Sequence, residues 1–161
     1  MIRPVADSDA AAITGIYNYY IQNTTVSFET TQLSEAEMLQ RIRAIAAGYP
    51  YFVALEEGRV VGYCYAHLWK ERMAYCHTWE VTIYLAPDSK GRGTGSALMR
   101  RLIDACRATG RCRNLIACIT EENAESIAFH RKMGFEKVSH FKSVGYKLGR
   151  WLDVVDMELS V

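Results

Sequence analysis

Three glycines at alternate positions, Gly91, Gly93 and Gly95, form the stretch of this sequence that most clearly indicates chemistry. Glycine leaves backbone N–H groups accessible and adopts positive φ at little cost. An apolar stretch at residues 81–85 precedes the run, and a helical pattern at residues 96–109 follows it. A helix start adds unpaired N–H donors and a partial positive charge. The strand, the glycine turn and the helix start together predict a cradle for a phosphate or pyrophosphate, and hence a nucleotide-like cofactor.

Two familiar phosphate-binding motifs do not fit this run. A Walker P-loop needs Gly-Lys followed by Ser or Thr, and no such sequence stands at the required spacing. The dinucleotide fingerprint G-x-G-x-x-G places its third glycine later, and it needs an acidic residue at an offset where this chain has none. The cradle is therefore expected to be of another kind.

Glu80 is the carboxylate whose position most suggests catalysis. Alternate residues of a strand share a face, so Glu80 lies opposite the apolar face of the odd-numbered residues 79 to 85. A carboxylate among apolar neighbours is costly unless it is paired, hydrated or functional. We interpret Glu80 as a general base; a solvated strand face and an ion pair with Arg72 are the alternatives.

Hydrophobic periodicity and turn residues predict the elements that position these groups. Strands are expected at residues 2–5, 51–55, 60–68, 75–85, 115–119, 135–141 and 151–159. Helices are expected at residues 13–21, 34–48, 96–109 and 123–134, with a capping box at Ser34 and Glu37. This order predicts one α/β (α+β) domain over residues 1–161, with a mixed central sheet flanked by about four helices.

Bulk composition limits the classes of function. The 161 residues suit one domain, and a hydrophobic share of 50% with a net charge of +1 argues against disorder. That charge gives no support for a nucleic-acid partner. No apolar run approaches the roughly 20 residues of a membrane span, and the first residues lack the features of a signal peptide. We therefore expect no membrane partner.

The five cysteines are an odd number without a CxxC pair, which makes a disulfide framework improbable in a domain of this size. A reducing cytoplasmic location is the expectation. Cys76 and His77 are adjacent, but no second ligand pair has suitable spacing, so we expect no metal.

The stretch Lys90-Gly91-Arg92-Gly93-Thr94-Gly95 resembles the acetyl-CoA-binding loop of the GNAT family of N-acetyltransferases, Gln/Arg-x-x-Gly-x-Gly/Ala, with Lys90 replacing the first residue. Residues 123–126 and 129–135 resemble a second family motif, and the likeness in element order covers essentially the whole chain. Within the family, residues 16–18, 78–85 and 145–154 are most similar to the phosphinothricin and methionine sulfoximine acetyltransferases.

This resemblance implies an acetyl-CoA-dependent N-acetyltransferase of a small amino acid analogue: phosphinothricin, methionine sulfoximine or methionine sulfone. It implies acetyl-CoA as cosubstrate. A cysteine acyl-enzyme route would need an oriented Cys–His pair, and no spacing in the sequence suggests one, so direct transfer in a ternary complex is favoured. The resemblance also implies a cofactor site built from Ile83, Tyr84, Leu85, Gly91, Arg92, Gly93, Thr94, Gly95, Ser96, Asn123 and Ser126. Asn123 caps a helix on any interpretation.

Amine acetylation needs a base, because an α-amine has a pKa of about 8 and is mostly protonated at neutral pH. Five residues separate Glu80 from Leu85, about 16 Å in a strand, which is comparable to an extended pantetheine arm. His130 stands where many relatives have the Tyr that protonates the leaving thiolate, so the resemblance makes it the second catalytic candidate. A histidine at a helix surface or core edge is the alternative. His67, His77 and His140 are predicted to be structural.

An acceptor carboxylate favours a bidentate arginine, and Arg72 matches an arginine of the phosphinothricin enzymes. We therefore expect a pocket wall of Arg72, Met73, Ala74 and Tyr75, with Phe28 opposite; an ordinary charged turn is the alternative. Lys142 and Tyr146 are further candidates, from the same or a second subunit, since relatives form homodimers.

Two other functions stay open. One is acetylation of another amine, such as a polyamine or a protein N-terminus, and the other is a non-catalytic acyl-CoA-binding sensor. The physiological acceptor, and whether herbicide resistance is a role or a by-product, also stay open.

Overall fold

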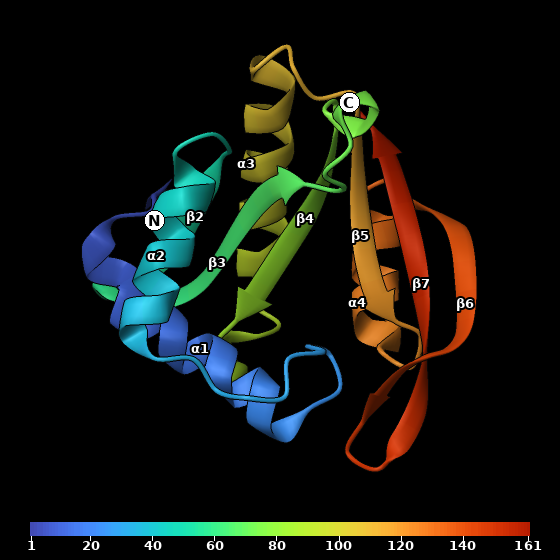
Figure 1. The fold of residues 1–161 in the computed structure, drawn as a ribbon. Coiled ribbons are helices and arrows are strands. Elements are labelled where there is room, and N and C mark those ends of the chain that lie inside the picture. The colour runs from blue at the N-terminus through green and yellow to red at the C-terminus, as the bar shows by residue number, and fades with distance from the viewer.

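Seven strands form one mixed sheet in the order β1-β2-β3-β4-β5-β7-β6, in a computed structural model of residues 1–161 (Figure 1). The strands are β1 (Ile2–Pro4), β2 (Tyr51–Glu56), β3 (Arg59–Leu68), β4 (Thr78–Leu85), β5 (Asn114–Thr120), β6 (Glu136–Lys147) and β7 (Arg150–Ser160). The four helices are α1 (Ala10–Asn23), α2 (Glu35–Ala46), α3 (Thr94–Ala108) and α4 (Ala124–Lys132). The expected α/β domain with a mixed sheet is confirmed.

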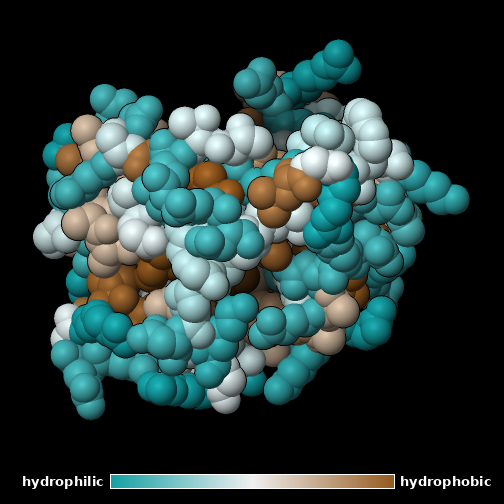
Figure 2. All heavy atoms as spheres, turned by 90° about the horizontal axis from the view of Figure 1, so that it is seen from below, coloured by the Kyte–Doolittle hydropathy of each residue, from teal (hydrophilic) through white to brown (hydrophobic).

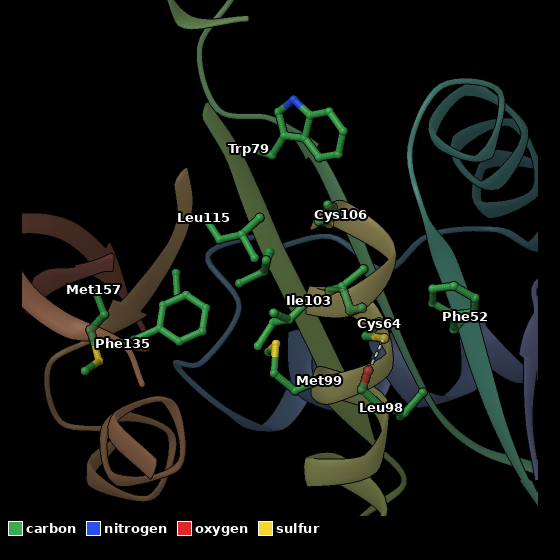
Figure 3. Packing of buried hydrophobic residues seen from close by; sticks show 14 of the residues in the cluster. Phe52, Cys64, Trp79, Leu98, Met99, Ile103, Cys106, Leu115, Phe135 and Met157 are labelled. Atoms are coloured by element: carbon green, nitrogen blue, oxygen red, sulfur yellow. Dashed lines mark hydrogen bonds between the residues drawn. The ribbon is translucent and has the colours of Figure 1, made fainter. Parts of the chain in front are cut away.

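The helices cover both faces of the sheet. Side chains of α1 and α2 pack against Tyr51, Val53 and Tyr63 on one face. On the other face, α3 packs against a larger cluster that includes the fully buried Trp79. Figure 3 shows this cluster, with Leu98, Met99 and Ile103 of α3 among Cys64, Trp79 and Leu115 of the sheet. No helix is long and apolar enough to cross a membrane.

The sheet divides between its central strands. Strands β4 and β5 are parallel and pair only at their first residues, Thr78 to Glu80 with Asn114 to Ile116. Beyond that point the two strands diverge, so that Figure 1 shows them adjacent at one end and apart at the other. Helix α3 connects them, as parallel neighbours require a crossover.

Two strand boundaries differ from the expectation. The strand predicted to begin at Tyr75 begins at Thr78, because Met73–Tyr75 forms a 3-10 turn in which Cys76 N donates to Met73 O at 3.0 Å. The strand predicted to end at residue 141 continues to Lys147. Irregularities in the β6–β7 pairing at 137/139 and 141/145 allow it to continue through polar residues.

The loop between α1 and α2 crosses the open end of the divided sheet. Figure 1 shows it reaching from α1 towards the β6–β7 hairpin. Thr120 at the end of β5 donates to Thr25 O at 2.7 Å, and the buried Lys147 donates to Ser27 O at 2.6 Å. These bonds hold the loop to the half of the sheet that is distant in sequence.

Candidate active site

The divergence of β4 and β5 opens a cavity of about 960 Å³. Its walls are β4, the glycine turn, the end of β5, the start of α4 and the α1–α2 loop. Figure 2 views the molecule from the open end of the divergence and shows a recess near the middle of this face, with hydrophobic atoms inside it. A cavity of this size accommodates part of a large ligand together with a small one.

One edge of β4 is free to bind an extended ligand. Peptide groups of successive residues in an antiparallel strand point alternately to its two sides. Because Thr78 O accepts from Trp69 N at 3.2 Å, even-numbered residues of β4 face β3, and the peptide groups of Ile83 and Leu85 face the gap. Leu85 O already accepts a hydrogen bond from the Tyr20 hydroxyl at 2.6 Å.

The glycine turn has the geometry of an anion cradle. Gly91 and Gly93 have φ of 79° and 83°, in the left-handed region that favours glycine. The first backbone bond of α3 is Ala97 N to Gly93 O at 3.0 Å, so the N–H groups at 94–96 precede any intrahelical acceptor. The partial positive charge of the helix start adds to these donors.

Most predicted cofactor residues line this one cavity. Those that line it are Ile83, Tyr84, Leu85, Gly91, Gly93, Gly95, Ser96, Asn123 and Ser126. The side chains of Arg92 and Thr94 do not, since both bind Glu56 at 3.1 Å. Their peptide groups remain in the turn. Lys90 also lines the cavity and forms a 3.5 Å ion pair with Glu125.

Glu80 lies where β4 and β5 part, and its side chain lines the cavity. Burial raises the pKa of its carboxyl above the ordinary value. The nearby His67 lowers this pKa, the Asp156 carboxylate raises it, and a hydrogen bond with Cys118 lowers it, each by less than burial does. Glu80 forms no ion pair with Arg72, so the surroundings favour proton uptake by this carboxyl.

His130 lines the cavity from α4 and is almost fully buried. Its Nδ1 lies 2.9 Å from Ser126 O and 3.3 Å from Ser126 Oγ. Burial lowers the pKa of the ring, which favours the neutral form. Because the carbonyl can only accept, the ring hydrogen lies on Nδ1 and Nε2 presents its lone pair. Asn123 Oδ1 accepts from Ser126 N at 3.2 Å and fixes the helix start beneath the ring.

The predicted acceptor residues are divided in space. Phe28 lines the cavity from the α1–α2 loop. The residues from Arg72 to Tyr75 lie outside it, in the turn between β3 and β4, and Arg72 is exposed without an ion pair. Lys142 and Tyr146 lie on the exposed β6–β7 hairpin, also outside the cavity. A single chain therefore brings together Glu80, His130, Phe28 and the cradle, but not the remaining candidates.

The structure adds groups that sequence reasoning missed. They are Tyr17, Glu29, Tyr65, His67 and Cys118, and all line the cavity. His67 was expected to be structural, yet it stands directly opposite Glu80 in the β3–β4 ladder. The strand register of the β3–β4 hairpin could have revealed this pairing, if the residues of the connecting turn had been predicted correctly. Tyr17 hydrogen-bonds Glu29, which Arg41 holds with bonds of 2.7 and 2.8 Å.

Comparison with known proteins agrees with this geometry. Residues 2–155 match the acetyltransferase (GNAT) domain, so the chain belongs to the GNAT acetyltransferase family. It is 40% identical over 159 residues to a phosphinothricin N-acetyltransferase of Alcaligenes faecalis, covering 98% of this chain and 80% of the relative. It is 35% identical to the L-methionine sulfoximine/L-methionine sulfone acetyltransferase of Salmonella typhimurium, covering 99% and 94%.

A solved structure is similar throughout. The crystal structure of a GNAT superfamily phosphinothricin acetyltransferase from Sinorhizobium meliloti, in complex with AcCoA, superposes with a TM-score of 0.96 at 42% identity. The match covers 100% of this chain and 88% of that one. The chain is therefore an acetyl-CoA-dependent N-acetyltransferase, and no cluster of side chains in it could hold a metal ion.

The contact between Phe28 and Gly145 gives a first prediction. A Cβ added at Gly145 would overlap the Phe28 ring, so Gly145→Ala should push this ring from its place in the cavity wall. We expect the KM for the acceptor amine to rise several-fold while the KM for acetyl-CoA is unchanged, as measured by steady-state kinetics. Gly48→Ala, where a Cβ meets open space, is the matched control. An unchanged acceptor KM in Gly145→Ala would show that Phe28 does not bound the acceptor site.

Proposed function

We propose that this protein transfers the acetyl group of acetyl-CoA to the α-amino group of a small amino acid analogue, such as phosphinothricin, methionine sulfoximine or methionine sulfone. The observation that carries the proposal is a single cavity with an anion cradle at one end and the half-buried carboxylate of Glu80 at the other. Leu85, at the cradle end, lies five positions along the strand from Glu80, about 16 Å away. The similarity to phosphinothricin and methionine sulfoximine acetyltransferases supports this choice of acceptor.

The cofactor lies along the free edge of β4. Its diphosphate takes the N–H groups of the turn from Gly91 to Ser96, and the pantetheine amides pair with the peptide groups of Ile83 and Leu85. This arm takes the place that β5 leaves when it diverges. Asn123 and Ser126 lie on the opposite wall and contact the arm from α4.

Glu80 acts as the general base. The acceptor arrives as an ammonium ion, which the carboxylates of Glu80 and the nearby Asp156 attract. Glu80 removes one proton, and its raised pKa reduces the cost of holding it. The freed nitrogen lone pair attacks the thioester carbonyl, the C–N bond forms and the C–S bond breaks. A second proton from the nitrogen ends on the departing thiolate.

His130 serves the thiolate side of the reaction. The side chain lines the cavity and its neutral ring has a lone pair on Nε2, so it must take up the second proton before it can deliver it. A group that accepts and then donates at neutral pH is what imidazole supplies. His130 therefore shuttles this proton from the tetrahedral intermediate to the sulfur.

Arg72, in the turn between β3 and β4, binds the acceptor carboxylate. Its guanidinium is exposed and free of ion pairs, and it follows β3 shortly after the position opposite Glu80. Met73, Ala74 and Tyr75 follow Arg72 in the same turn and are the further acceptor contacts of this proposal, with Phe28 contributing from the cavity wall. The bidentate geometry of an arginine suits an α-carboxylate.

The protein functions as a homodimer in the cytoplasm. Exposed apolar side chains gather on the β6–β7 hairpin at one edge of the sheet: Val138, Phe141, Val144, Tyr146, Leu148 and Trp151. Covering them with a second copy removes this apolar surface from water and brings Lys142 and Tyr146 towards an acceptor site. All five cysteines are free thiols, which suits a reducing compartment. Resistance to phosphinothricin as a herbicide follows from acetylation of its amine.

A panel of amines with acetyl-CoA tests the acceptor. Release of free thiol should give the highest kcat/KM for phosphinothricin, methionine sulfoximine and methionine sulfone, and much lower values for spermidine and for a peptide with a free N-terminus. Preference for spermidine or the peptide would replace the proposed acceptor. Binding of acetyl-CoA without turnover of any amine would favour the acyl-CoA sensor.

Replacement of the base gives a separate prediction. Glu80→Gln keeps the shape of the side chain but cannot hold the proton, so kcat should fall about 10²-fold or more. Calorimetric affinity for acetyl-CoA should stay within a factor of two. In the unsubstituted protein the base must be ionised, and burial raises its pKa. Activity should therefore be lost on acidification at a higher pH than an ordinary glutamate would give. Unchanged turnover in Glu80→Gln would show that Glu80 is not the general base.

Charge placed on the hairpin tests the dimer. Trp151 is 67% exposed, so Trp151→Glu should leave folding intact but weaken self-association at least about tenfold, because a carboxylate cannot be buried cheaply. Sedimentation velocity measures the change. Tyr19→Glu on α1, at a side chain 43% exposed, is the matched control and should not alter association. A monomer in all three proteins would reject the dimer.

A further inference from the structure

His67 faces Glu80 across the β3–β4 ladder. The two residues are direct partners in the antiparallel register, so their side chains emerge on the same face of the sheet. Directly opposed residues have Cβ atoms about 4.5–5.5 Å apart. Both side chains line the cavity. An imidazole and a carboxylate are thus held next to each other at the end of the site where the acceptor amine reacts.

The backbone sets the orientation and tautomer of the His67 ring. His67 Nδ1 lies 2.8 Å from Leu68 O, and a carbonyl oxygen only accepts, so the hydrogen of the neutral ring is on Nδ1. Nε2 then carries a lone pair. Nε2 has no hydrogen-bond partner. Every buried side-chain nitrogen or oxygen in the chain has a partner, so Nε2 is not buried and is open to solvent. The ring is arranged to accept a proton at Nε2.

His67 is the basic side chain that directly faces Glu80. No Lys or Arg forms an ion pair with Glu80. On its other side lie Cys118 and the Asp156 carboxylate. Tyr65 packs against the His67 ring with centroids 5.7 Å apart.

The charges beyond Tyr65 balance each other. Tyr65 feels the charges of Glu29 and Arg41, and these two residues form an ion pair with each other. The Glu80 carboxylate is therefore the charged group directly opposite His67, and Asp156 acts on Glu80 from the other side.

We propose that His67 is a positioning residue that acts through Glu80, receiving at Nε2 the proton that Glu80 removes from the acceptor ammonium. This inference rests on the proposed N-acetyltransferase function. When the proton moves, the O–H bond of the Glu80 carboxyl breaks and the Nε2–H bond forms, leaving a carboxylate beside an imidazolium. The imidazolium then gives the proton to water, so Glu80 is ionised again for the next acceptor.

The proton count of the whole reaction agrees with this step. An ammonium with three hydrogens becomes an amide with one. One proton leaves through Glu80 and His67 to solvent, and the other ends on the thiolate of coenzyme A. A charged His67 also favours the ionised form of Glu80, because its charge lowers the pKa of that carboxyl.

His67→Asn tests the relay, because Asn can still donate to Leu68 O but has no basic Nε2. We expect kcat to fall about 10²-fold and the KM for acetyl-CoA to stay unchanged. Loss of the imidazole removes the influence that lowers the pKa of Glu80, so the acidic limb of the kcat/KM profile should move to higher pH. His77→Asn is the matched control, since His77 Nδ1 also lies on a carbonyl, Arg111 O at 2.6 Å, but outside the cavity. Its profile should equal that of the unsubstituted protein.

Chemical rescue separates proton transfer from packing. Added imidazole should restore part of the turnover of His67→Ala, and it should not restore that of Glu80→Gln. His67→Gln serves as a second variant if His67→Asn does not fold, with acetyl-CoA binding by calorimetry as the check of folding. An unshifted pH profile together with absent rescue would overturn the relay. If the unsubstituted protein acetylates none of the amines, the proposed function fails; if it acetylates them and His67→Asn does so equally well, only the relay fails.

Discussion

The early end of the β4–β5 ladder is the constraint on which the rest of the site depends. Pairing stops at Glu80 and Ile116. Peptide groups of β4 beyond that point have no strand partner on one side, and unpaired peptide groups in an enclosed space are unfavourable. An extended ligand with amide groups restores those hydrogen bonds. In the proposed binding mode, the gap therefore supplies both the shape of the cofactor site and part of the driving force for filling it.

The width of the gap is maintained from both ends. At the joined end, the buried side chains of Trp79 and Leu115 pack in one cluster with α3. At the open end, the α1–α2 loop connects the two halves of the sheet through Thr120 and Lys147. The Lys147 ammonium is almost completely buried, and the Ser27 carbonyl satisfies part of its hydrogen-bonding capacity. A frame closed at both ends needs little rearrangement to admit its ligands, which lowers the cost of binding.

Local patterns predicted the elements, the glycine cradle and Glu80, because each depends on residues close in sequence. The alternation of apolar residues from 79 to 85 was enough to turn Glu80 towards the other face. His67 was not predicted as a site residue, since its partner depends on the register of the β3–β4 hairpin, which the local pattern of the long connection at residues 69–77 does not fix. The continuation of β6 past residue 141 was also missed, because its side chains are mostly exposed and show no alternation. The α1–α2 loop joins the site only through tertiary contacts, which periodicity does not encode.

The two histidines of the cavity share one backbone device, and in the proposed mechanism each ring serves one proton transfer. In His67 and in His130, a main-chain carbonyl holds Nδ1 and leaves Nε2 free. The first ring extends from β3 beside Glu80, and the second extends from α4 on the far side of the gap. A nucleophilic nitrogen must lose one proton before attack and another during collapse of the intermediate, at opposite sides of the reacting carbon. In the proposed mechanism two separate imidazoles meet this requirement, whereas a single ring would have to release its first proton before it could accept the second.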